Sequence, residues 1–370
     1  MKFIPVAKPC IGTLEAKEVY KTLKSNWITM GQKVAKFEKE FALSVDCKYA
    51  LATNNGTSAL HLCLRAIGIK ENDEVIIPNI TFISTINVVL YEKAIPVLVD
   101  CSQEDFNILP KEIEKKITKK TKAIIGVDMN GLPFNYDELI KISKKYQIKL
   151  IADSAESYGA KYKDKKVGSI APLHSFSFFA NKNITTGEGG MITTNNLSYY
   201  KKMKILRNQG QKFRYNHIDL GYNYRMTDIS ATIGLVQLKK INQITKNKKI
   251  IVDRYYKLLK DNKYYKIAKL PNYSHNHSWY NFTIILCNNR FRNYMALELK
   301  KVGIETRFSF PPLSTQPFIK KNKKINCKNL KNSEEGWKKL INIPIFNDLS
   351  IKEQEYICKK IKNITKNFYS

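Results

Sequence analysis

The chain has 370 residues, of which 43% are hydrophobic and 11% aromatic, so it can build a buried core and is not globally disordered. This length favours one large domain and a smaller one. The formal net charge is +31, from 63 Lys and Arg against 32 Asp and Glu, yet no arginine-rich tail or nucleic-acid-binding fingerprint occurs. General use of Lys, Asn and Ile along the chain accounts for the charge, although the field could still attract an anionic ligand.

The cysteines and the first residues indicate the compartment. Seven widely spaced cysteines without a CxxC pair argue against a disulfide framework and against a zinc site. The start, MKFIPVAKPCIG, lacks the apolar run of a signal peptide, and no stretch approaches a membrane span. We therefore expect a cytoplasmic protein with no metal, no nucleic-acid partner and no membrane partner.

Short apolar runs alternate with helical patterns in the first two-thirds of the chain. Runs of about four to six apolar residues separated by helices predict a mostly parallel sheet with helices on both faces. The predicted strands are 49–55, 75–79, 95–100, 123–128 and 149–154, followed by 173–179 and 190–195. The predicted helices are 57–68, 81–93, 110–120 and 135–146.

A second region is predicted from about Thr245, where a helix through IIVDRYYKLLK begins. A strand over 279–286, a helix over 292–303 and a last helix after Ser350 follow, with Ser350 and Glu353 at the spacing of a capping box. The sequence thus predicts an α/β fold with a large cofactor-binding domain over 1–244 and a smaller α/β domain over 245–370. The lysine-rich stretch 318–331 is interpreted as a solvated loop.

The first candidate site feature follows the strand at 49–55. In Asn54-Asn55-Gly56-Thr57-Ser58, a glycine allows close approach of the backbone, and the free N–H groups of a helix start favour an anion. The alternative is an ordinary helix N-cap by Thr57 or Ser58, which is the better explanation for this stretch alone.

Two further features fall at strand ends. Asp153 closes an apolar strand in IADSAE, where a carboxylate is either a loop residue or the partner of a buried cation. Lys182 stands in SFSFFANKNITTGEGGM, between a strand and a glycine-rich turn, with Ser177 five residues before it. In parallel α/β sheets, such strand ends carry the binding site.

Taken together, these parts suit pyridoxal phosphate. That cofactor needs a lysine for the Schiff base, a carboxylate for the pyridinium nitrogen and an anion cup for the phosphate. Each part is a weak signal alone, and their order on one parallel α/β scaffold is a much stronger one.

The sequence also resembles a known family nearly end to end, namely the nucleotide-sugar aminotransferases. These are pyridoxal-phosphate enzymes of the aspartate-aminotransferase fold (fold type I), and the pattern is nearest to the 4-aminotransferases that make perosamine-type sugars. The resemblance implies a large domain with a mostly parallel seven-stranded sheet and a smaller C-terminal α/β domain. The motifs that carry it, in order, are SNWI, NNGTSALHLCLRAIGI, PNITFIST, DSAESYGAKY, FSFFANKNITTGEGGM, LRNQGQ, GYNYRMTD and GIETRFSFPPL.

The resemblance assigns roles to the residues at the strand ends. Lys182 would form the Schiff base and move the proton between the cofactor carbon and C4 of the sugar, while Asp153 would keep the pyridinium nitrogen protonated. Phe82 would stack on the pyridine ring, although it could simply be a core residue. Glu156 lies where relatives place a polar residue near cofactor or sugar. The phosphate would be held by Gly56, Thr57, Ser58 and Ser177.

The same resemblance implies a homodimer with shared active sites. Asn223, in GYNYRM, would reach the cofactor phosphate of the neighbouring subunit. Arg225 and Arg307 are candidates for contacts to the substrate or its diphosphate, and they equally fit structural ion pairs. His217 also matches the family pattern and is either structural or in contact with substrate.

Three positions depart from the family pattern. Phe308 stands where relatives commonly have proline, Ser314 where they commonly have histidine, and Ala180 where glycine is frequent. These changes leave the cofactor residues intact. Because the C-terminal segment borders the substrate pocket in the family, they leave the sugar and the nucleotide open.

The expected reaction is transamination. L-glutamate would donate its amino group to the cofactor, and the amine would pass to a nucleoside-diphosphate 4-keto-6-deoxyhexose, giving a 4-amino-4,6-dideoxy sugar of perosamine or viosamine type. The nearest alternatives are a sugar 3-dehydratase or a 3-aminotransferase of the same family. Some of those dehydratases have histidine in place of the lysine, so the presence of Lys182 weighs against a dehydratase. An inactive relative that binds anions or nucleic acid is the alternative from another class.

Overall fold

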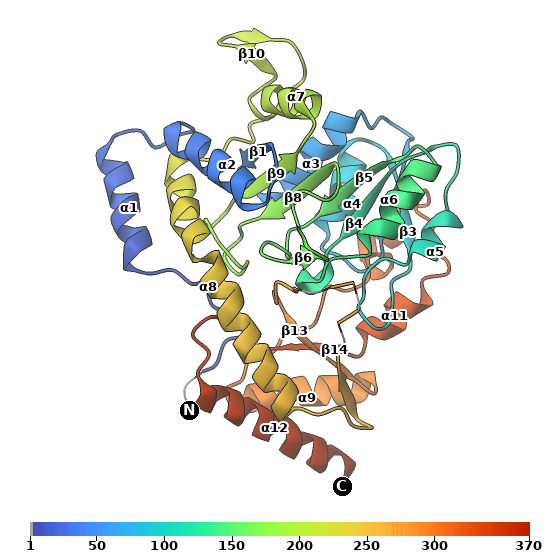
Figure 1. Cartoon of the computed structure of the whole chain (residues 1–370). Coiled ribbons are helices and arrows are strands. Elements are labelled where there is room, and N and C mark those ends of the chain that lie inside the picture. The colour runs from blue at the N-terminus through green and yellow to red at the C-terminus, as the bar shows by residue number, and fades with distance from the viewer. Residues whose placement is uncertain (1–2, 269, 272, 275) are drawn as a thin grey trace.

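The computed structural model describes residues 3–268, 270–271, 273–274 and 276–370, and its centre is a seven-stranded sheet (Figure 1). The strand order is β1-β9-β8-β5-β4-β2-β3. All neighbours in β8-β5-β4-β2-β3 are parallel, and β9 is antiparallel to both β1 and β8. The strands are β1 (Tyr49–Thr53), β2 (Glu74–Pro78), β3 (Ile95–Val99), β4 (Thr121–Val127), β5 (Lys149–Asp153), β8 (Leu173–Ser177) and β9 (Gly190–Thr194). The predicted α/β class and the seven-stranded, mostly parallel sheet are confirmed.

Helices cover both faces of this sheet because successive strand residues point to opposite sides. Leu51 of β1 packs in one core, together with side chains from two helices, whereas Ala50 and Ala52 pack in another core on the opposite face. The first core lies under α3 (Gly56–Ile67), α4 (Ser84–Tyr91) and α7 (Leu197–Arg207). The opposite face packs against α2 (Gln32–Ser44), α8 (Asp228–Leu258) and α6 (Tyr136–Lys145), with α5 (Pro110–Glu114) beside α6.

A second, smaller sheet lies at the other end of the molecule (Figure 1). It has three antiparallel strands, β12 (Tyr265–Ile267), β13 (Phe282–Leu286) and β14 (Leu340–Ile343). The helices α9 (Asn289–Lys301) and α12 (Ile351–Tyr369) pack with it around one apolar core. The capping box predicted at Ser350 is confirmed, since its side chain accepts from the Glu353 N–H and Glu353 accepts from the Ser350 N–H.

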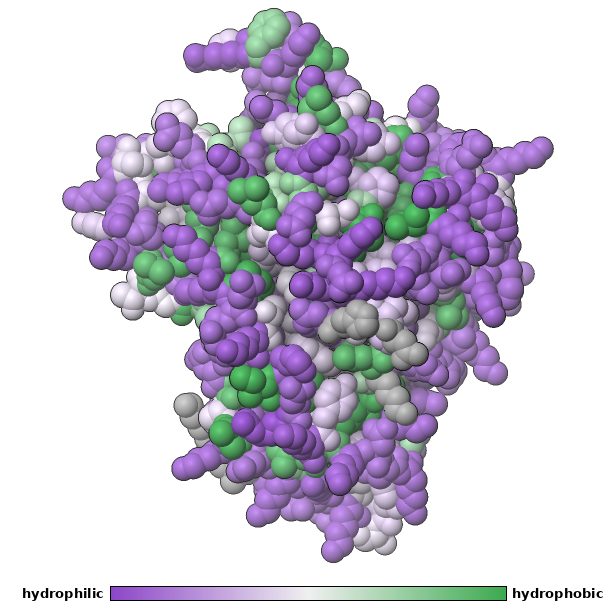
Figure 2. All heavy atoms as spheres, viewed as in Figure 1, coloured by the Kyte–Doolittle hydropathy of each residue, from purple (hydrophilic) through white to green (hydrophobic). Residues whose placement is uncertain are grey.

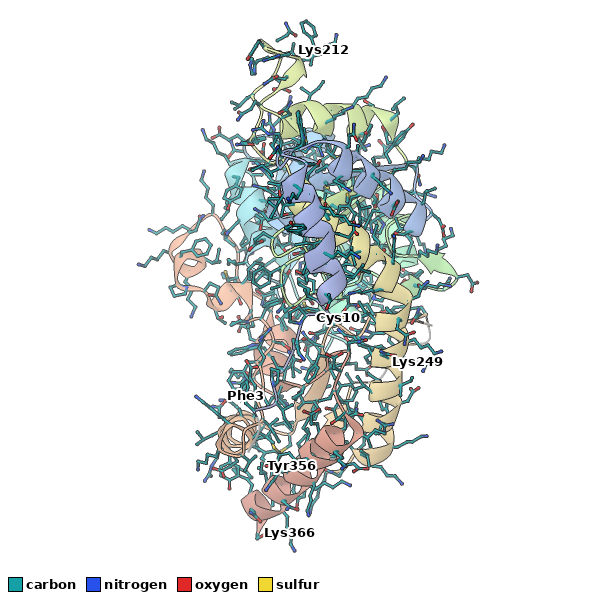
Figure 3. All side chains as sticks on the ribbon, turned by 90° about the vertical axis from the view of Figure 1, so that its left-hand side faces the viewer. Phe3, Cys10, Lys212, Lys249, Tyr356 and Lys366 are labelled. Atoms are coloured by element: carbon teal, nitrogen blue, oxygen red, sulfur yellow. The ribbon has the colours of Figure 1, made fainter. Side chains whose placement is uncertain are left out.

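The N-terminal segment joins the two ends of the molecule. Ile4 forms a parallel bridge with Ile304 and is buried in the core of the small sheet. The chain then runs past Cys10 to α1 (Thr13–Lys24), which packs along α8 (Figure 3). The start of the chain is thus part of the smaller sheet's core, and α1 belongs to the other end.

The long helix α8 crosses the boundary that the sequence predicts at 244/245. The helix begins at Asp228, not near Thr245, because Thr227 caps its first turn and the apolar pattern continues without a break. Ala231, Leu235 and Ile244 pack on the large sheet's side, and Ile251 to Tyr255 join the small sheet's core. A division at that boundary would cut one continuous helix, and the two domain ranges remain a prediction.

The remaining elements are short helices and short strands outside the two sheets. The lysine-rich stretch 318–331 is not simply a solvated loop, because Ile319, Ile325 and Leu330 are buried in the core under α3 and α4. The elements are η1 (Met129–Gly131), β6 (Lys161–Tyr162), β7 (Lys165–Lys166), β10 (Gln211–Phe213), β11 (Asn216–His217), η2 (Leu313–Thr315), α10 (Pro317–Lys321) and α11 (Lys331–Trp337).

Hydrophilic side chains spread over most of the face seen in Figure 2 and apolar ones are scattered between them. Within the described part of the chain, no helix is both long and apolar enough to cross a membrane.

Candidate active site

A cavity of about 440 Å³ opens where the first residues of α3 meet the carboxyl ends of β5 and β8. This is the edge at which parallel strands of an α/β sheet present their binding site. Seven of the predicted site residues line it, namely Gly56, Thr57, Phe82, Asp153, Glu156, Ser177 and Lys182.

The start of α3 forms one end of the cavity. Asn55, not Thr57 or Ser58, is the N-cap, because its side chain accepts from the Ser58 N–H at 2.8 Å. The alternative of a cap by Thr57 or Ser58 is therefore wrong. A Cβ on Gly56 would lie 2.8 Å from the Cβ of Ser177, so only glycine lets the two segments approach this closely. The Thr57 hydroxyl hydrogen-bonds the Ser84 hydroxyl at 2.7 Å.

Asp153 is a buried carboxylate at the end of β5. The Thr85 hydroxyl donates to its Oδ2 at 3.0 Å, and the Ala155 N–H donates to its Oδ1 at 3.3 Å. Burial raises the pKa of the Asp153 carboxyl, while these hydrogen bonds and the charge of Lys182 oppose the rise. A buried carboxylate without a full set of donors is suited to bind a cationic N–H.

Lys182 enters the cavity between a carboxylate and an aromatic ring. Its Nζ lies 3.4 Å from the Oε1 of Glu156 and 4.3 Å from the centre of the Tyr280 ring. Burial lowers the pKa of Lys182, but Tyr280, Glu156 and Asp153 together outweigh burial and raise it. Burial likewise raises the pKa of Glu156, against the lysine charge and a hydrogen bond from the Asn130 N–H.

Phe82 is not a core residue, since 52% of its surface is exposed. Its ring packs 5.4 Å from that of Phe310, and both line the cavity. An aromatic side chain exposed in a cavity can stack against the planar ring of a bound molecule.

The other predicted residues do not line this cavity in the single chain. Ser58 is buried in the first turn of α3. His217, in the β10–β11 hairpin, is exposed, and its Nδ1 lies 2.8 Å from the Gln209 carbonyl oxygen. Arg225 donates to the Asn208 side chain at 2.6 Å, exposed Arg307 bridges Asn342 through its backbone, and Asn223 is also exposed. None of the ion pairs between described residues of the single chain includes Arg225 or Arg307, and the roles of both arginines remain predictions.

Sequence reasoning missed several residues that line the cavity. Tyr280 and Phe310 lie far along the chain from the strand ends, in segments whose strand or loop pattern gives no sign of the cavity. Glu188 stands inside the glycine-rich turn TTGEGG, and its carboxylate was the only feature in the sequence that could have indicated a site residue. Asn181 precedes Lys182, and its buried Oδ1 has no hydrogen-bond partner among the described residues.

The two C-terminal departures from the family pattern lie beside the cavity rather than in it. Ser314 is buried, its hydroxyl donates to Glu334 at 2.7 Å and accepts from the Asn79 side chain at 3.1 Å. Phe308 lies under the guanidinium of Arg292 at 4.0 Å. Phe310, between them, is the residue of this segment that lines the cavity.

These residues fit a phosphorylated pyridine aldehyde. The cavity has a helix start and Ser177 for a phosphate, a buried carboxylate for a ring N–H, an aromatic face for the ring and one lysine amine. Together with the seven-stranded sheet, this donor set defines a pyridoxal-phosphate-dependent transferase of fold type I.

Comparisons with known proteins agree with this class. Residues 9–362 match the sequence model of the DegT/DnrJ/EryC1/StrS aminotransferase family, so the chain belongs to that family. It is 38% identical to GDP-perosamine synthase of Escherichia coli O157:H7, over 100% of both chains.

Two solved structures superpose on nearly the whole chain. Spr1654 of Streptococcus pneumoniae, described as a sugar aminotransferase in its PMP form, is 31% identical with a TM-score of 0.93 and covers 99% of this chain and 98% of its own. GDP-4-keto-6-deoxy-D-mannose-3-dehydratase of E. coli, with bound hydrated PLP, is 25% identical with a TM-score of 0.90 and covers 98% and 100%. The chain is thus a PLP-dependent sugar aminotransferase by family, and its cofactor is pyridoxal 5′-phosphate.

Proposed function

We propose that the protein transfers the amino group of L-glutamate to C4 of a nucleoside-diphosphate 4-keto-6-deoxyhexose, giving a 4-amino-4,6-dideoxyhexose of perosamine or viosamine type and 2-oxoglutarate. The observation that carries the proposal is the position of Lys182, held between Glu156 and Tyr280 in a cavity that also contains Asp153. The 38% identity to a GDP-perosamine synthase over both full lengths supports a 4-keto sugar as the substrate.

Each residue of the cavity has a separate role in the proposed reaction. The bound cofactor supplies an electron sink for charge that develops on the carbon next to the transferred nitrogen. Lys182 would bond the cofactor and move a proton between the cofactor carbon and C4 of the sugar. Asp153 would keep the ring nitrogen protonated, and Phe82 would cover one ring face. The phosphate would be held by Gly56, Thr57 and Ser177, which line the cavity, with Ser58 as a further candidate behind them. Glu156 would orient the Lys182 amine.

The substrate sugar needs the side of the cavity that the cofactor residues leave free. Phe310 and Tyr280 give that side an apolar surface suited to a deoxygenated sugar. Arg307 lies near enough to Tyr280 for its charge to act on the tyrosine hydroxyl, which supports a role in binding the diphosphate. Arg225 and His217 are the further candidates for contacts to substrate.

The protein is proposed to act as a homodimer with shared sites. Asn223 is exposed and lies outside the cavity of its own chain, which suits a contact to the cofactor phosphate of a neighbouring subunit. Exposed apolar side chains support such an assembly, including Trp27 before α2 and Tyr215 and Leu220 in and after the β10–β11 hairpin. A cytoplasmic location fits the use of a nucleotide sugar.

The test begins with the visible spectrum of the purified protein before and after adding L-glutamate. A band of lysine-bound cofactor that is replaced by the pyridoxamine form supports the first half of the reaction. The aminated protein is then offered GDP-, UDP- and dTDP-linked 4-keto-6-deoxyhexoses, and the products are analysed by mass spectrometry and NMR.

The products separate the proposal from its rivals. A 4-amino sugar supports it. Loss of the C3 hydroxyl would instead make the protein a 3-dehydratase, which the likeness to the E. coli dehydratase makes the first rival to check. A protein with no band after addition of PLP, but with salt-sensitive DNA binding, would be the inactive anion-binding relative.

A further inference from the structure

A strained turn precedes Tyr280. Trp279 has a backbone φ of +52°, in the left-handed region that a bulky aromatic residue rarely adopts. Residues held in such conformations persist only where the surroundings fix them, and they gather at functional sites. The turn places the next residue, Tyr280, with its ring 4.3 Å from the Lys182 Nζ.

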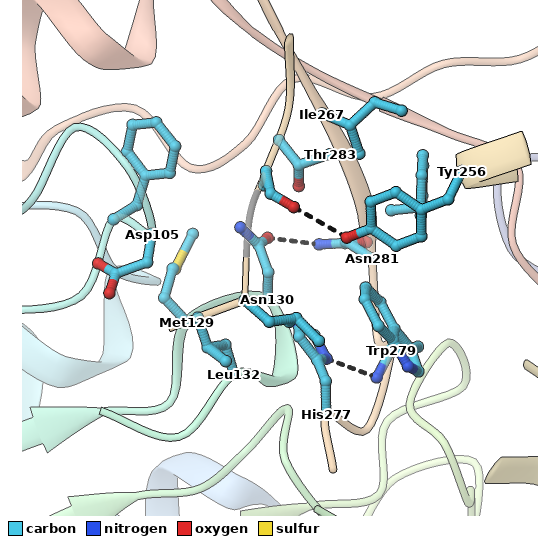
Figure 4. A pocket seen from close by; sticks show the side chains of 14 residues that line it. Asp105, Met129, Asn130, Leu132, Tyr256, Ile267, His277, Trp279, Asn281 and Thr283 are labelled. Carbon is cyan, nitrogen blue, oxygen red and sulfur yellow. Dashed lines mark hydrogen bonds between the residues drawn. The ribbon is translucent and has the colours of Figure 1, made fainter. Parts of the chain in front are cut away.

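Contacts on one side of the turn fix its shape. The Trp279 N–H donates to the Nδ1 of His277 at 2.7 Å, and the two rings stack at 4.1 Å (Figure 4). The Asn281 side chain donates to that of Asn130 at 2.9 Å, on the same wall of a small cavity shown in Figure 4. The first contacts lie within the turn, and the Asn281–Asn130 hydrogen bond anchors it to η1.

A buried lysine holds the turn from the other side. Lys248, in the middle of α8, is only 6% exposed. Its Nζ donates to the Trp279 carbonyl oxygen at 3.1 Å and to the Asn183 side chain at 2.7 Å. Asn183 follows Lys182 directly and donates in turn to the Ser278 carbonyl oxygen at 2.8 Å. One amine therefore ties the lysine-bearing loop to the turn that carries Tyr280.

Lys248 has hydrogen-bond acceptors but no counter-ion. None of the ion pairs between described residues includes it, and burial lowers its pKa to about 7. A buried amine without a counter-ion costs stability, and such a group is retained where it serves another purpose.

We propose that Lys248 is a positioning residue of the active site: it locks the strained turn at Trp279 and thereby keeps the Tyr280 ring against the Lys182 amine. The ring face lies 4.3 Å from the Lys182 Nζ, and the Tyr280 hydroxyl also interacts with that amine. Burial raises the pKa of this hydroxyl, so Tyr280 is uncharged at neutral pH. A ring face favours the ammonium form of Lys182 over the neutral amine. The charged groups facing Lys182 are Glu156 and Asp153.

This inference rests on the proposed role of Lys182, and its test needs neither cofactor nor turnover. Cofactor-free protein is treated with trace acetic anhydride at pH 8, and the acetylation rate of Lys182 is measured by peptide mass spectrometry. Only the neutral amine reacts. Loss of the Tyr280 ring therefore speeds the labelling of Lys182, by about 3- to 10-fold for a cation–π contact of this kind.

The decisive design is a double-mutant cycle of the wild type, Lys248→Met, Tyr280→Leu and the double variant. If Lys248 acts through Tyr280, both single variants speed the labelling and the double variant is no faster than either. A direct charge effect of Lys248 is small at pH 8, because burial lowers its pKa to about 7, and it has the opposite sign, since removing positive charge raises the pKa of Lys182 and slows labelling. Tyr280→Phe keeps the ring face and removes only the hydroxyl, so it is expected to label more slowly than Tyr280→Leu.

Two further variants serve as a control and as a replacement. Lys249→Met removes the next lysine of α8, which points outward and pairs with Asp253 at 3.0 Å, and should leave the Lys182 rate unchanged (Figure 3). Lys248→Gln, too short to span both acceptors, replaces the methionine variant if that protein does not fold. Wild-type or slower labelling in Lys248→Met, wild-type labelling in Tyr280→Leu, or multiplied effects in the double variant would each overturn the inference. None of these results would touch the proposed function, which loss of the lysine-bound cofactor band in Lys182→Ala tests separately.

Discussion

The Oε1 atom of Glu156 lies 3.4 Å from the Nζ of Lys182, while its Oε2 accepts the Asn130 N–H at 2.8 Å. One oxygen of this buried carboxylate is thus fixed by the backbone, and the other faces the lysine. Asn130 has a positive φ of 59°, which turns its N–H towards Glu156. The arrangement holds the amine at one place in the cavity before any cofactor bond forms.

Replacing Lys182 removes the only lysine amine that lines the cavity of the described chain. We expect Lys182→Ala to lower the turnover number at least about 10³-fold, because both the cofactor bond and the proton transfer depend on this group. Aminotransfer is measured by the release of 2-oxoglutarate. Lys163→Ala, at an exposed surface ion pair with Asp137, is the matched control and should keep wild-type turnover. An active Lys182→Ala protein would contradict the mechanism.

Replacing Asp153 by asparagine keeps the shape of the side chain and removes its charge. Thr85 and the Ala155 N–H already donate to this carboxyl group, so an amide in its place loses good partners as well. We expect the dissociation constant of PLP to rise about 10- to 100-fold, as for the loss of a charged hydrogen bond. Titration of the cofactor-free protein, followed by absorbance, measures it. Asp137→Asn at the surface provides the comparison, and equal affinities in the two variants would exclude a ring-nitrogen role for Asp153.

The strand-end residues could be predicted from sequence because their signals are local. Asp153 and Lys182 each follow an apolar run, and the carboxyl ends of parallel strands meet at one edge. Tyr280 and Lys248 carry no such signal, since a tyrosine before a strand and a lysine in a lysine-rich helix are ordinary in the sequence. Their positions depend on how α8 and the segment before β13 pack, which is a long-range property. The start of α8 was also predicted wrongly. The residues before Asp228 belong to the GYNYRMTD motif and do not have the composition of a plain loop, so they gave no clear signal that a helix begins there.

Gly56 is predicted to be intolerant of any side chain. A Cβ there would lie 2.8 Å from the Ser177 Cβ, so alanine forces apart the two segments that form the phosphate end of the cavity. We expect Gly56→Ala to weaken PLP binding at least about tenfold and to lower the free energy of unfolding by about 1–3 kcal/mol through overpacking. Gly12→Ala is the control, since a Cβ at that position would meet no atom within 4 Å beyond its own chain neighbours. Unchanged cofactor affinity in Gly56→Ala would mean that the phosphate binds elsewhere.

The proposed shared site predicts complementation between a variant without Lys182 and a variant with weakened cofactor retention. Asn223→Ala alone should lose cofactor more readily, and Lys182→Ala alone should be inactive. In a mixed dimer, one site combines both defects and the other combines the intact Lys182 of one chain with the intact Asn223 of its neighbour. Mixing the two proteins under conditions that exchange subunits should therefore restore activity, at most to about a quarter of the wild-type value for random pairing. Activity that stays at the sum of the two separate proteins would show that each chain completes its own site.

The buried ring of His174 predicts an acid-sensitive stability. Its Nε2 accepts the Ala171 N–H at 2.8 Å, and its Nδ1 lies 2.9 Å from the Ser154 hydroxyl, which itself donates to Asp128. Burial lowers the pKa of His174 to about 3. The unfolded chain takes up this proton near pH 6.5 and the folded chain does not, so the contribution of His174 to the free energy of unfolding falls as the pH drops from 6.5 towards 3.

Urea unfolding at a series of pH values tests this. From pH 6 to 4.5, His174→Gln is expected to lose about 2 kcal/mol less stability than the wild type, because each unit of pH is worth about 1.4 kcal/mol for one such group. Burial also lowers the pKa of His277 to about 3 and raises the pKa of Asp128 to about 7, which acts on stability with the opposite sign. Both groups are present in both proteins, so the difference between the two curves reports on His174. His217→Gln, at an exposed histidine, should follow the wild-type curve. Parallel curves for His174→Gln and the wild type would mean that His174 becomes protonated in the folded state, with the loss of its contact to the Ala171 N–H.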